Sequence, residues 1–181
     1  MPAQRRFAAL DTSFLLALAA GDDNCAEVID WLSDNKIYPL ATGTVLQELA
    51  DIDQQEGGDP FKKQNAEKAL LSFGTWGVLD AALSPIDNGI AQMVAKKFVE
   101  KNVLPDEHDN DGLVVAEAAL HECKMLITYR DTLLDAPLEG IKFMLIESDV
   151  PVLFVVSPDD VIAYLRKTEE TTSAETLPSV S

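Results

Sequence analysis

The chain has 181 residues, enough for one domain with a sizeable core. Hydrophobic residues make up 47% of it and charged residues 25%, which excludes a disordered chain, a coiled coil and a collagen-like repeat. A formal net charge of −17 argues against nonspecific binding of nucleic acids or membranes through a basic surface. Two cysteines are too few for a disulfide framework, so a reduced cytoplasm is the simplest setting.

The N-terminal segment partly has the pattern of a secretory signal peptide. Arg5 and Arg6 precede the apolar run 14–20. However, the segment 11–13 between them carries a carboxylate, which a signal peptide rarely has there. We therefore expect a cytoplasmic protein. No apolar run reaches the about 18 residues of a membrane span, so no membrane partner is expected.

Strand-like and helix-like segments alternate along the chain. The expected strands cover 7–10, 37–41, 125–128 and 152–156, and the expected helices cover 14–20, 24–32, 42–52, 61–102 with an interruption at 73–80, 113–121 and 157–167. Alternation of this kind is typical of a parallel sheet with helices on both faces. We therefore expect a three-layer α/β/α sandwich with a central, mainly parallel, Rossmann-like sheet.

The chain shows no internal repeat and no boundary between two domains. Residues 1–167 are expected to form a single domain. The segment 168–181 is rich in Thr, Glu and Ser and has little to bury, so we expect it to be a disordered tail.

Acidic residues follow the expected strands. Asp11 comes directly after the first strand, and Glu48 lies in the helix after the second. Asp111 opens the helix before a later strand, and Asp131 follows that strand. Ligands of open parallel sheets bind beyond the carboxyl ends of the strands, so these four side chains are expected to converge. Gathered carboxylates repel one another, and a hard cation such as Mg²⁺ or Mn²⁺ is the usual compensation.

Four segments, in this order, resemble the motifs of the PIN-domain family, the metal-dependent ribonucleases similar to the PilT N-terminus, with toxin-type relatives. They are Ala-Leu-Asp-Thr-Ser-Phe-Leu-Leu at 9–16, Val-Leu-Gln-Glu-Leu at 45–49, Asp-Asn-Asp-Gly-Leu-Val-Val-Ala-Glu-Ala at 109–118 and Leu-Ile-Thr-Tyr-Arg-Asp at 126–131. The segment 152–164 is similar to the closing strand and helix of the family.

The resemblance implies an endoribonuclease that depends on Mg²⁺ or Mn²⁺ and hydrolyses RNA phosphodiester bonds with metal-activated water. Asp11, Glu48 and Asp111 match the core metal-binding acids of the family, and Asp131 matches the more variable fourth acid. Asp109 joins the candidate metal set, either as a group behind the direct ligands or as loop charge. The resemblance also implies an RNA substrate, a homodimer and, in toxin-type members, an antitoxin protein as partner.

The fourth motif departs from the pattern of many members. The acid usually comes two residues after the threonine, but here Arg130 stands two residues after Thr128 and Asp131 follows. The departure and the acidic charge support an alternative, a catalytically impaired PIN-like module that binds or regulates. A phosphoryl-transfer enzyme using Asp11 as nucleophile is disfavoured, since Ser13 stands where a second acid is wanted.

Each candidate residue also has a purely structural interpretation. Asp11 and Asp111 can cap the helices that they precede, and Glu48 can be an exposed helix side chain. Glu117 lies two turns after Asp111, so it faces either the acidic cluster or the solvent. Thr128 either orients a phosphate or ends a strand.

Basic residues cluster on two expected helices. The clusters are Lys62, Lys63 and Lys68 on one helix and Lys96, Lys97 and Lys101 on another. Together with Arg130 they either frame a groove for a phosphate backbone or are the solvated faces of amphipathic helices.

Overall fold

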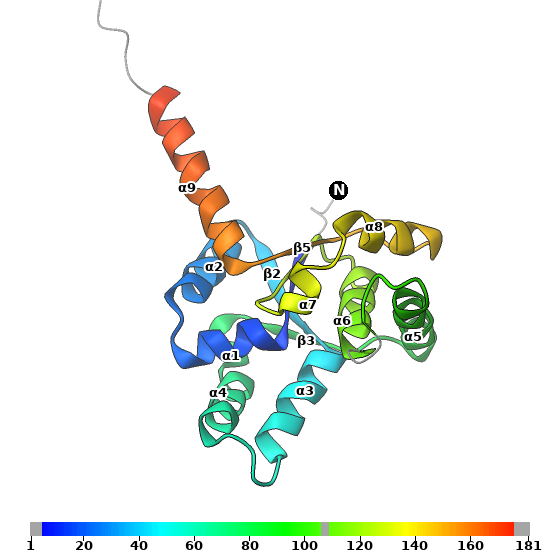
Figure 1. Ribbon diagram of the computed structural model, residues 1–181. Coiled ribbons are helices and arrows are strands. Elements are labelled where there is room, and N and C mark those ends of the chain that lie inside the picture. The colour runs from blue at the N-terminus through cyan, green and yellow to red at the C-terminus, as the bar shows by residue number, and fades with distance from the viewer. Residues whose placement is uncertain (1–4, 106–108, 176–181) are drawn as a thin grey trace, which may run out of the picture.

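A parallel sheet forms the centre of the molecule (Figure 1). The computed structural model describes residues 5–105 and 109–175, without the side chains of 109 and 168–175. Over these residues the sheet has five strands in the order β3-β2-β1-β4-β5, all paired in parallel. The strands are β1 (Arg6–Leu10), β2 (Ile37–Thr42), β3 (Leu79–Ala81), β4 (Met125–Ile127) and β5 (Phe154–Val156).

Helices cover both faces of this sheet. They are α1 (Thr12–Ala20), α2 (Asp23–Asp34), α3 (Gly43–Gln54), α4 (Pro60–Trp76), α5 (Pro85–Glu100), α6 (Asp109–Leu120), α7 (Asp131–Leu134), α8 (Leu138–Glu147) and α9 (Pro158–Glu175). Helices α1, α2 and α4 lie on one side of the sheet in Figure 1, and α5, α6 and α8 lie on the other. The prediction of a three-layer α/β/α sandwich is confirmed.

The central strands consist of small and branched apolar residues because both of their faces are covered. In β1, Ala8, Ala9 and Leu10 are fully buried, as are Leu126 and Ile127 in β4. Strands buried on both faces have continuous apolar runs, whereas strands with one exposed face alternate. The apolar run therefore ends where the chain leaves the sheet, and polar groups follow at that point.

The strand order reverses between β1 and β4, the central pair of the sheet. Strands β2 and β3 follow β1 along the chain and lie on one side of it in the sheet. Strands β4 and β5 come later in the chain and lie on the other side of β1. The backbone N–H of Asp11 donates to the carbonyl of Ile127 at 3.0 Å, so both strands end at one level. Such a switch point opens a crevice outside the carboxyl ends of the strands.

The structure corrects several expected boundaries. The expected interruption at 73–80 begins later, because α4 continues to Trp76, and the edge strand β3 follows at Leu79–Ala81. Helices α7 and α8 lie where no element was expected. Helix α6 begins at Asp109, so Asp111 lies in its first turn and is not the residue preceding the helix. Helix α2 is capped by Asp22, whose carboxylate accepts from the N–H of Cys25 at 2.8 Å.

The C-terminal helix is longer than expected. Helix α9 projects from the body in Figure 1 and continues past residue 167 to Glu175, so the first part of the expected disordered tail is helical. The rest of that tail, 176–181, lies outside the described residues. Among the described helices, none combines the length and apolar character that crossing a membrane requires.

Candidate metal centre

Asp11 is held so that its two carboxylate oxygens have different surroundings. It follows β1, caps α1 and is fully buried. Its Oδ2 accepts from the hydroxyls of Ser13 and Thr128, at 2.7 and 2.8 Å, and from the N–H of Ser13 at 3.3 Å. Its Oδ1 is buried with no hydrogen-bond partner among the described residues. Asp11 thus caps α1 through Oδ2, while its Oδ1 accepts no hydrogen bond from the described residues.

Glu48 reaches the same crevice from α3. The helix starts at the end of β2, which lies next to β1, so its second turn faces the end of β1. Thr12 donates its hydroxyl to Glu48 Oε2, and the Glu48 side chain is only 15% exposed. The interpretation of Glu48 as an exposed helix side chain is therefore wrong.

Asp111 enters the crevice from the first turn of α6 and is fully buried. The hydroxyl of Thr132 donates to Asp111 Oδ2. Helix α6 packs closely on α5 at Gly112. A Cβ atom built on this glycine would lie 3.1 Å from the Cα of Ala95, so a larger residue would not fit without a shift. Gly112 thus permits the close approach of α5 and α6 directly beside Asp111.

Arg130 lies between these three carboxylates. Its Nη2 is 2.8 Å from Glu48 Oε2 and 3.4 Å from Asp11 Oδ1, and its Nη1 bonds Asp111 Oδ1. Burial alone disfavours its charge, but the three carboxylates together raise the pKa of Arg130 above its usual value. The expectation that the acids converge therefore holds for Asp11, Glu48 and Asp111, with an arginine as their shared counter-ion.

The three carboxylates fit a divalent metal ion in chemistry. They supply oxygen atoms only, the donors preferred by Mg²⁺ and Mn²⁺, and Asp11 Oδ1 is a buried oxygen without a hydrogen bond. In the part of the chain that the structure describes, however, no three Asp, Glu, His or Cys side chains are grouped to hold a metal ion. The guanidinium of Arg130 occupies the space between them.

Asp131 and Asp109 are placed differently from the three core acids. Asp131 is exposed and starts α7, and it lines the pocket beside the cluster without being among the ion-pair partners of Arg130. Asp109 begins α6, but its side chain lies outside the described part of the structure.

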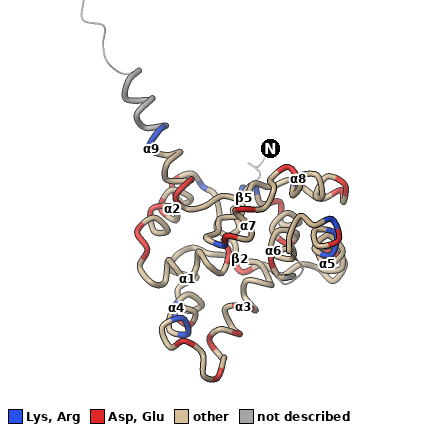
Figure 2. The backbone as a smooth tube through the Cα atoms, in the orientation of Figure 1, with Lys and Arg blue, Asp and Glu red and all other residues tan. Residues whose placement is uncertain are grey.

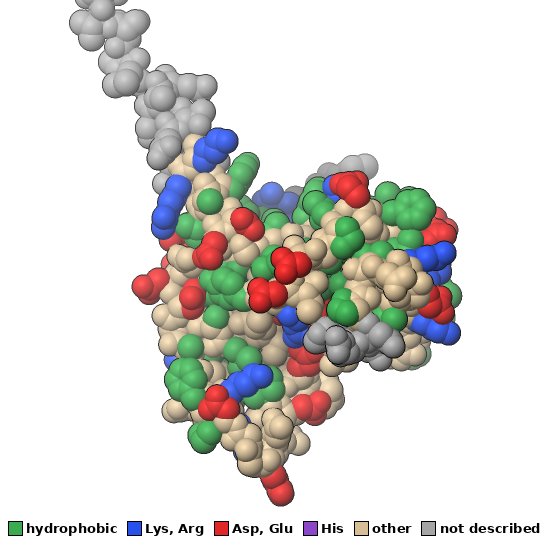
Figure 3. All heavy atoms as spheres, in the orientation of Figure 1, with side chains coloured by type: hydrophobic (Ala, Val, Ile, Leu, Met, Phe, Trp, Pro, Cys, Tyr) green, Lys and Arg blue, Asp and Glu red, His purple; other side chains and the backbone are tan. Residues whose placement is uncertain are grey.

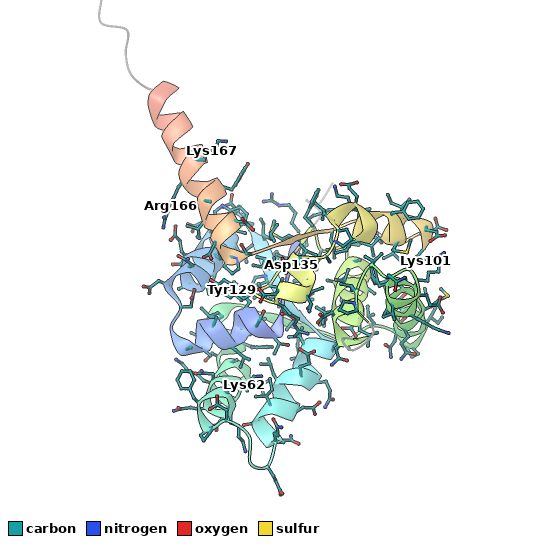
Figure 4. The ribbon with its side chains drawn as sticks, in the orientation of Figure 1. Lys62, Lys101, Tyr129, Asp135, Arg166 and Lys167 are labelled. Atoms are coloured by element: carbon teal, nitrogen blue, oxygen red, sulfur yellow. The ribbon has the colours of Figure 1, made fainter. Side chains whose placement is uncertain are left out.

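An open pocket of about 630 Å³ adjoins the cluster. Its lining includes Glu48, Arg130, Asp131 and Lys62 of α4. Figure 4 shows Lys62 on α4 and Tyr129 and Asp135 around α7. A pocket lined by both basic groups and carboxylates, next to an acidic cluster, is suited to a phosphate ester held next to a metal ion.

The other expected basic residues do not line this pocket. Lys68 donates to the carbonyl of Ala19, and Lys97 donates to the hydroxyl of Ser148 at 3.2 Å. Basic residues of α4 and α5 lie on opposite sides of the sheet in Figure 2, and Figure 3 shows basic side chains over α5 at one edge of this face. A single groove framed by both lysine clusters is therefore not formed in this arrangement.

Glu117 supports the site indirectly. It is buried, and its Oε2 and Oε1 accept from the N–H and the hydroxyl of Thr44, at 3.0 and 2.9 Å. Thr42, which precedes α3, makes no capping hydrogen bond with its side chain. A carboxylate from α6 thus caps the helix that carries Glu48. Glu117 was expected to face either the acidic cluster or the solvent, but its hydrogen-bond partner is Thr44.

Comparisons with known proteins place this arrangement in a known fold. No protein-family model matches the sequence, and no curated protein sequence matches it either. Among solved structures, VapBC2 from Rickettsia felis, bound to a DNA fragment from its promoter, matches with a TM-score of 0.57 and 14% identity over 83% of this chain and 98% of that chain.

Two further structures match to a similar extent. FitAcB from Neisseria gonorrhoeae has a TM-score of 0.51 and 13% identity, over 83% of this chain and 97% of that chain. FitAB bound to the IR36 DNA fragment has a TM-score of 0.50 and 15% identity, over 83% and 94%. At sequence identities this low, the structural match shows a shared fold. The chain therefore has the PIN-like fold of these VapC- and FitB-type structures, as its four motifs predict.

Proposed function

We propose that the protein is an endoribonuclease that depends on Mg²⁺ or Mn²⁺, with Asp11, Glu48 and Asp111 as the metal-binding acids. One observation carries this proposal. Three carboxylates from three separate segments meet at the carboxyl edge of the sheet, and Asp11 Oδ1 is buried there without a hydrogen bond. Three carboxylates in one crevice repel one another, and the single charge of Arg130 compensates only one of them, so a divalent cation is the additional charge that the cluster favours.

The neighbouring hydroxyl groups prepare the carboxylates for this role. Ser13 and Thr128 fix Oδ2 of Asp11, Thr12 fixes Oε2 of Glu48, and Thr132 fixes Oδ2 of Asp111. Hydrogen bonds from groups behind the metal ligands orient the atoms that bind the metal ion. A divalent cation bound there supplies polarisation of a phosphodiester and activation of a water molecule. Because water is the nucleophile, the products should carry 5′-phosphate and 3′-hydroxyl ends.

The pocket beside the cluster supports RNA as the substrate. Lys62 is exposed at its rim and offers a positive charge to a phosphate, whereas Asp131 carries a negative charge at the same rim. We propose that Asp131 acts as an outer acid of the site, less tightly engaged than the core three.

Incubation of the full chain with a labelled mixed RNA pool tests the proposal. Wild type should cleave in Mn²⁺ and stop in EDTA, and Asp11→Asn should lose activity by a factor of about a hundred or more, since loss of a group behind a metal ligand already costs about 10- to 100-fold. Asp135→Asn is the matched control, since Asp135 is exposed at the end of α7 (Figure 4). Equal cleavage by wild type and Asp11→Asn would assign the activity to a contaminant.

A second candidate is a PIN-like module that binds or regulates without cleaving. The three ion pairs of Arg130 favour it, because a permanent guanidinium in the cluster would leave no place for a metal ion. RNA or protein binding by wild type with no metal-dependent cleavage, and no gain of cleavage in Arg130→Gln, would select this candidate.

We also propose an antitoxin partner, a homodimer and a cytoplasmic setting. Two of the similar structures, VapBC2 and FitAB, are bound to DNA fragments, which supports a DNA-binding partner for this chain as well. The product of a neighbouring gene, if it is a small DNA-binding protein, should copurify with this chain. Light scattering of the purified chain measures the oligomeric state.

A further inference from the structure

The side chain of Arg130 contacts all three carboxylates of the cluster. Nη2 is 2.8 Å from Glu48 Oε2, Nη1 is 3.5 Å from Glu48 Oε1, and Nη1 also bonds Asp111. Nη2 lies 3.4 Å from Asp11 Oδ1 without forming a hydrogen bond. The guanidinium thus contacts one oxygen of each aspartate and both oxygens of Glu48.

Charge in the cluster is only partly compensated by this arrangement. Asp11 and Asp111 are fully buried, the Glu48 side chain is 15% exposed, and a single guanidinium pairs with all three carboxylates. The interior of a protein disfavours an excess of like charge, so the cluster retains an affinity for a more highly charged cation. A divalent ion would compensate one more negative charge than Arg130 does.

The backbone of Arg130 is anchored while its side chain borders open space. The N–H of Arg130 donates to Thr128 Oγ1 at 2.9 Å, and its carbonyl accepts from the N–H groups of Leu133 and Leu134, the last two residues of α7. The side chain itself is 24% exposed and lines the pocket of about 630 Å³. The guanidinium can therefore leave the carboxylates by side-chain rotation alone, with the backbone unchanged.

We propose that Arg130 and a divalent cation are alternative occupants of one site, so that the metal binds only after the guanidinium has moved into the pocket. The inference rests on the proposed function for the identity of the ion. The structure shows the state with Arg130 inside. The apparent affinity for the metal is the intrinsic affinity reduced by the fraction of molecules in which Arg130 is outside. Arg130 thus competes with the metal ion for the carboxylates. The metal ion binds when its concentration is high or when another ligand draws the guanidinium out of the cluster.

Mn²⁺ affinity of the full chain, measured by calorimetry without RNA, tests this competition. Arg130→Gln should bind Mn²⁺ about tenfold or more tightly than wild type, because no guanidinium has to be displaced. Lys62→Gln is the matched control, since it removes the same charge from the same pocket without removing a partner of the acids. Its Mn²⁺ affinity should change by less than about threefold.

Arg130→Lys covers the case in which Arg130→Gln does not fold. A lysine keeps the charge but cannot bridge three carboxylates with a planar fork, so its Mn²⁺ affinity should lie above that of wild type. Equal Mn²⁺ affinities in wild type and both variants would overturn the inference, and so would an equal gain in Lys62→Gln.

The outcomes separate this inference from the proposed nuclease activity. Tighter Mn²⁺ binding by Arg130→Gln, with no RNA cleavage by either protein, would support the competition and remove the nuclease. Metal-dependent cleavage by wild type, with equal affinities in all variants, would support the nuclease and remove the competition.

Discussion

Thr128 donates its hydroxyl to Asp11 Oδ2 at 2.8 Å and accepts the N–H of Arg130 at 2.9 Å. The end of β4 is thereby joined both to the first acid of the cluster and to the residue that carries its counter-ion. The interpretation of Thr128 as a residue that only ends a strand is therefore incomplete, because its hydroxyl bonds both Asp11 and Arg130. The threonine fixes which oxygen of Asp11 faces the crevice.

Thr128→Val should lower the free energy of unfolding by about 2 kcal/mol, because a hydrogen bond to a buried carboxylate is lost and the N–H of Arg130 loses its acceptor. Thermal unfolding measures this as a fall in Tm of about 4–8 °C for a domain of this size. Thr128→Ser keeps the hydroxyl and should lose less than half as much. A valine variant as stable as wild type would show that Thr128 does not hold Asp11.

Glu117→Gln should weaken the cap of α3, since a neutral amide replaces a carboxylate at the N-terminus of a helix. The expected loss is about 1 kcal/mol, measured by urea unfolding. Glu56→Gln, which makes the same change at an exposed position, is the control. A loss no greater in Glu117→Gln than in Glu56→Gln would contradict the capping role.

Lys62→Gln should weaken RNA binding and reduce the slope of log affinity against log salt by up to about 1, the value for one phosphate contact. The reason is its place on the rim of the pocket beside the carboxylates. Lys101→Gln should leave the slope unchanged, because Lys101 lies at the end of α5, far from Lys62 in Figure 4. Filter binding at several salt concentrations measures both. Equal slopes in wild type and Lys62→Gln would exclude a phosphate contact at Lys62.

His121 should make the fold sensitive to mild acid. Burial lowers its pKa below the usual value, against the opposing effects of Glu117, the carbonyl of Ala81 and Asp87, and its Nε2 is buried without a hydrogen bond among the described residues. Below about pH 6.5 the unfolded chain binds a proton that the folded chain does not, so stability falls as the pH falls.

His121→Gln removes this proton uptake. Its Tm should fall less than that of wild type between about pH 7.5 and pH 5.5. Parallel Tm curves for the two proteins over this range would show that His121 titrates alike in the folded and unfolded chains.

The sheet and the positions of the core acids could be predicted because they depend on local patterns. Apolar runs of strand length ended by a polar residue mark where β1 and β2 leave the sheet, and Asp11 stands at such an end. The three-residue strand β3 could not be read in this way, because it lies at the edge of the sheet and only Ala81 in it is partly buried. Helix α8 is apolar over most of its length, so its sequence does not separate helix from buried strand.

The contacts that complete the site depend on residues distant in the chain. The sequence shows that Arg130 replaces an acid of the family pattern, but whether its side chain turns inward depends on carboxylates delivered by three other segments. Glu117 likewise finds Thr44 only because α6 packs against α3. A basic residue at a position that the family gives to an acid was the one available signal for the ion-pair cluster.

A crystal of the full chain soaked in Mn²⁺ shows whether the three acids bind a metal ion in place of Arg130, because anomalous scattering locates the ion without reference to activity. We expect one peak in contact with Asp11 Oδ1 and with the carboxylates of Glu48 and Asp111, and the Arg130 side chain turned into the pocket lined by Lys62. A Mn²⁺-soaked crystal with Arg130 still bonded to all three acids, and with any peak outside the cluster, would contradict it.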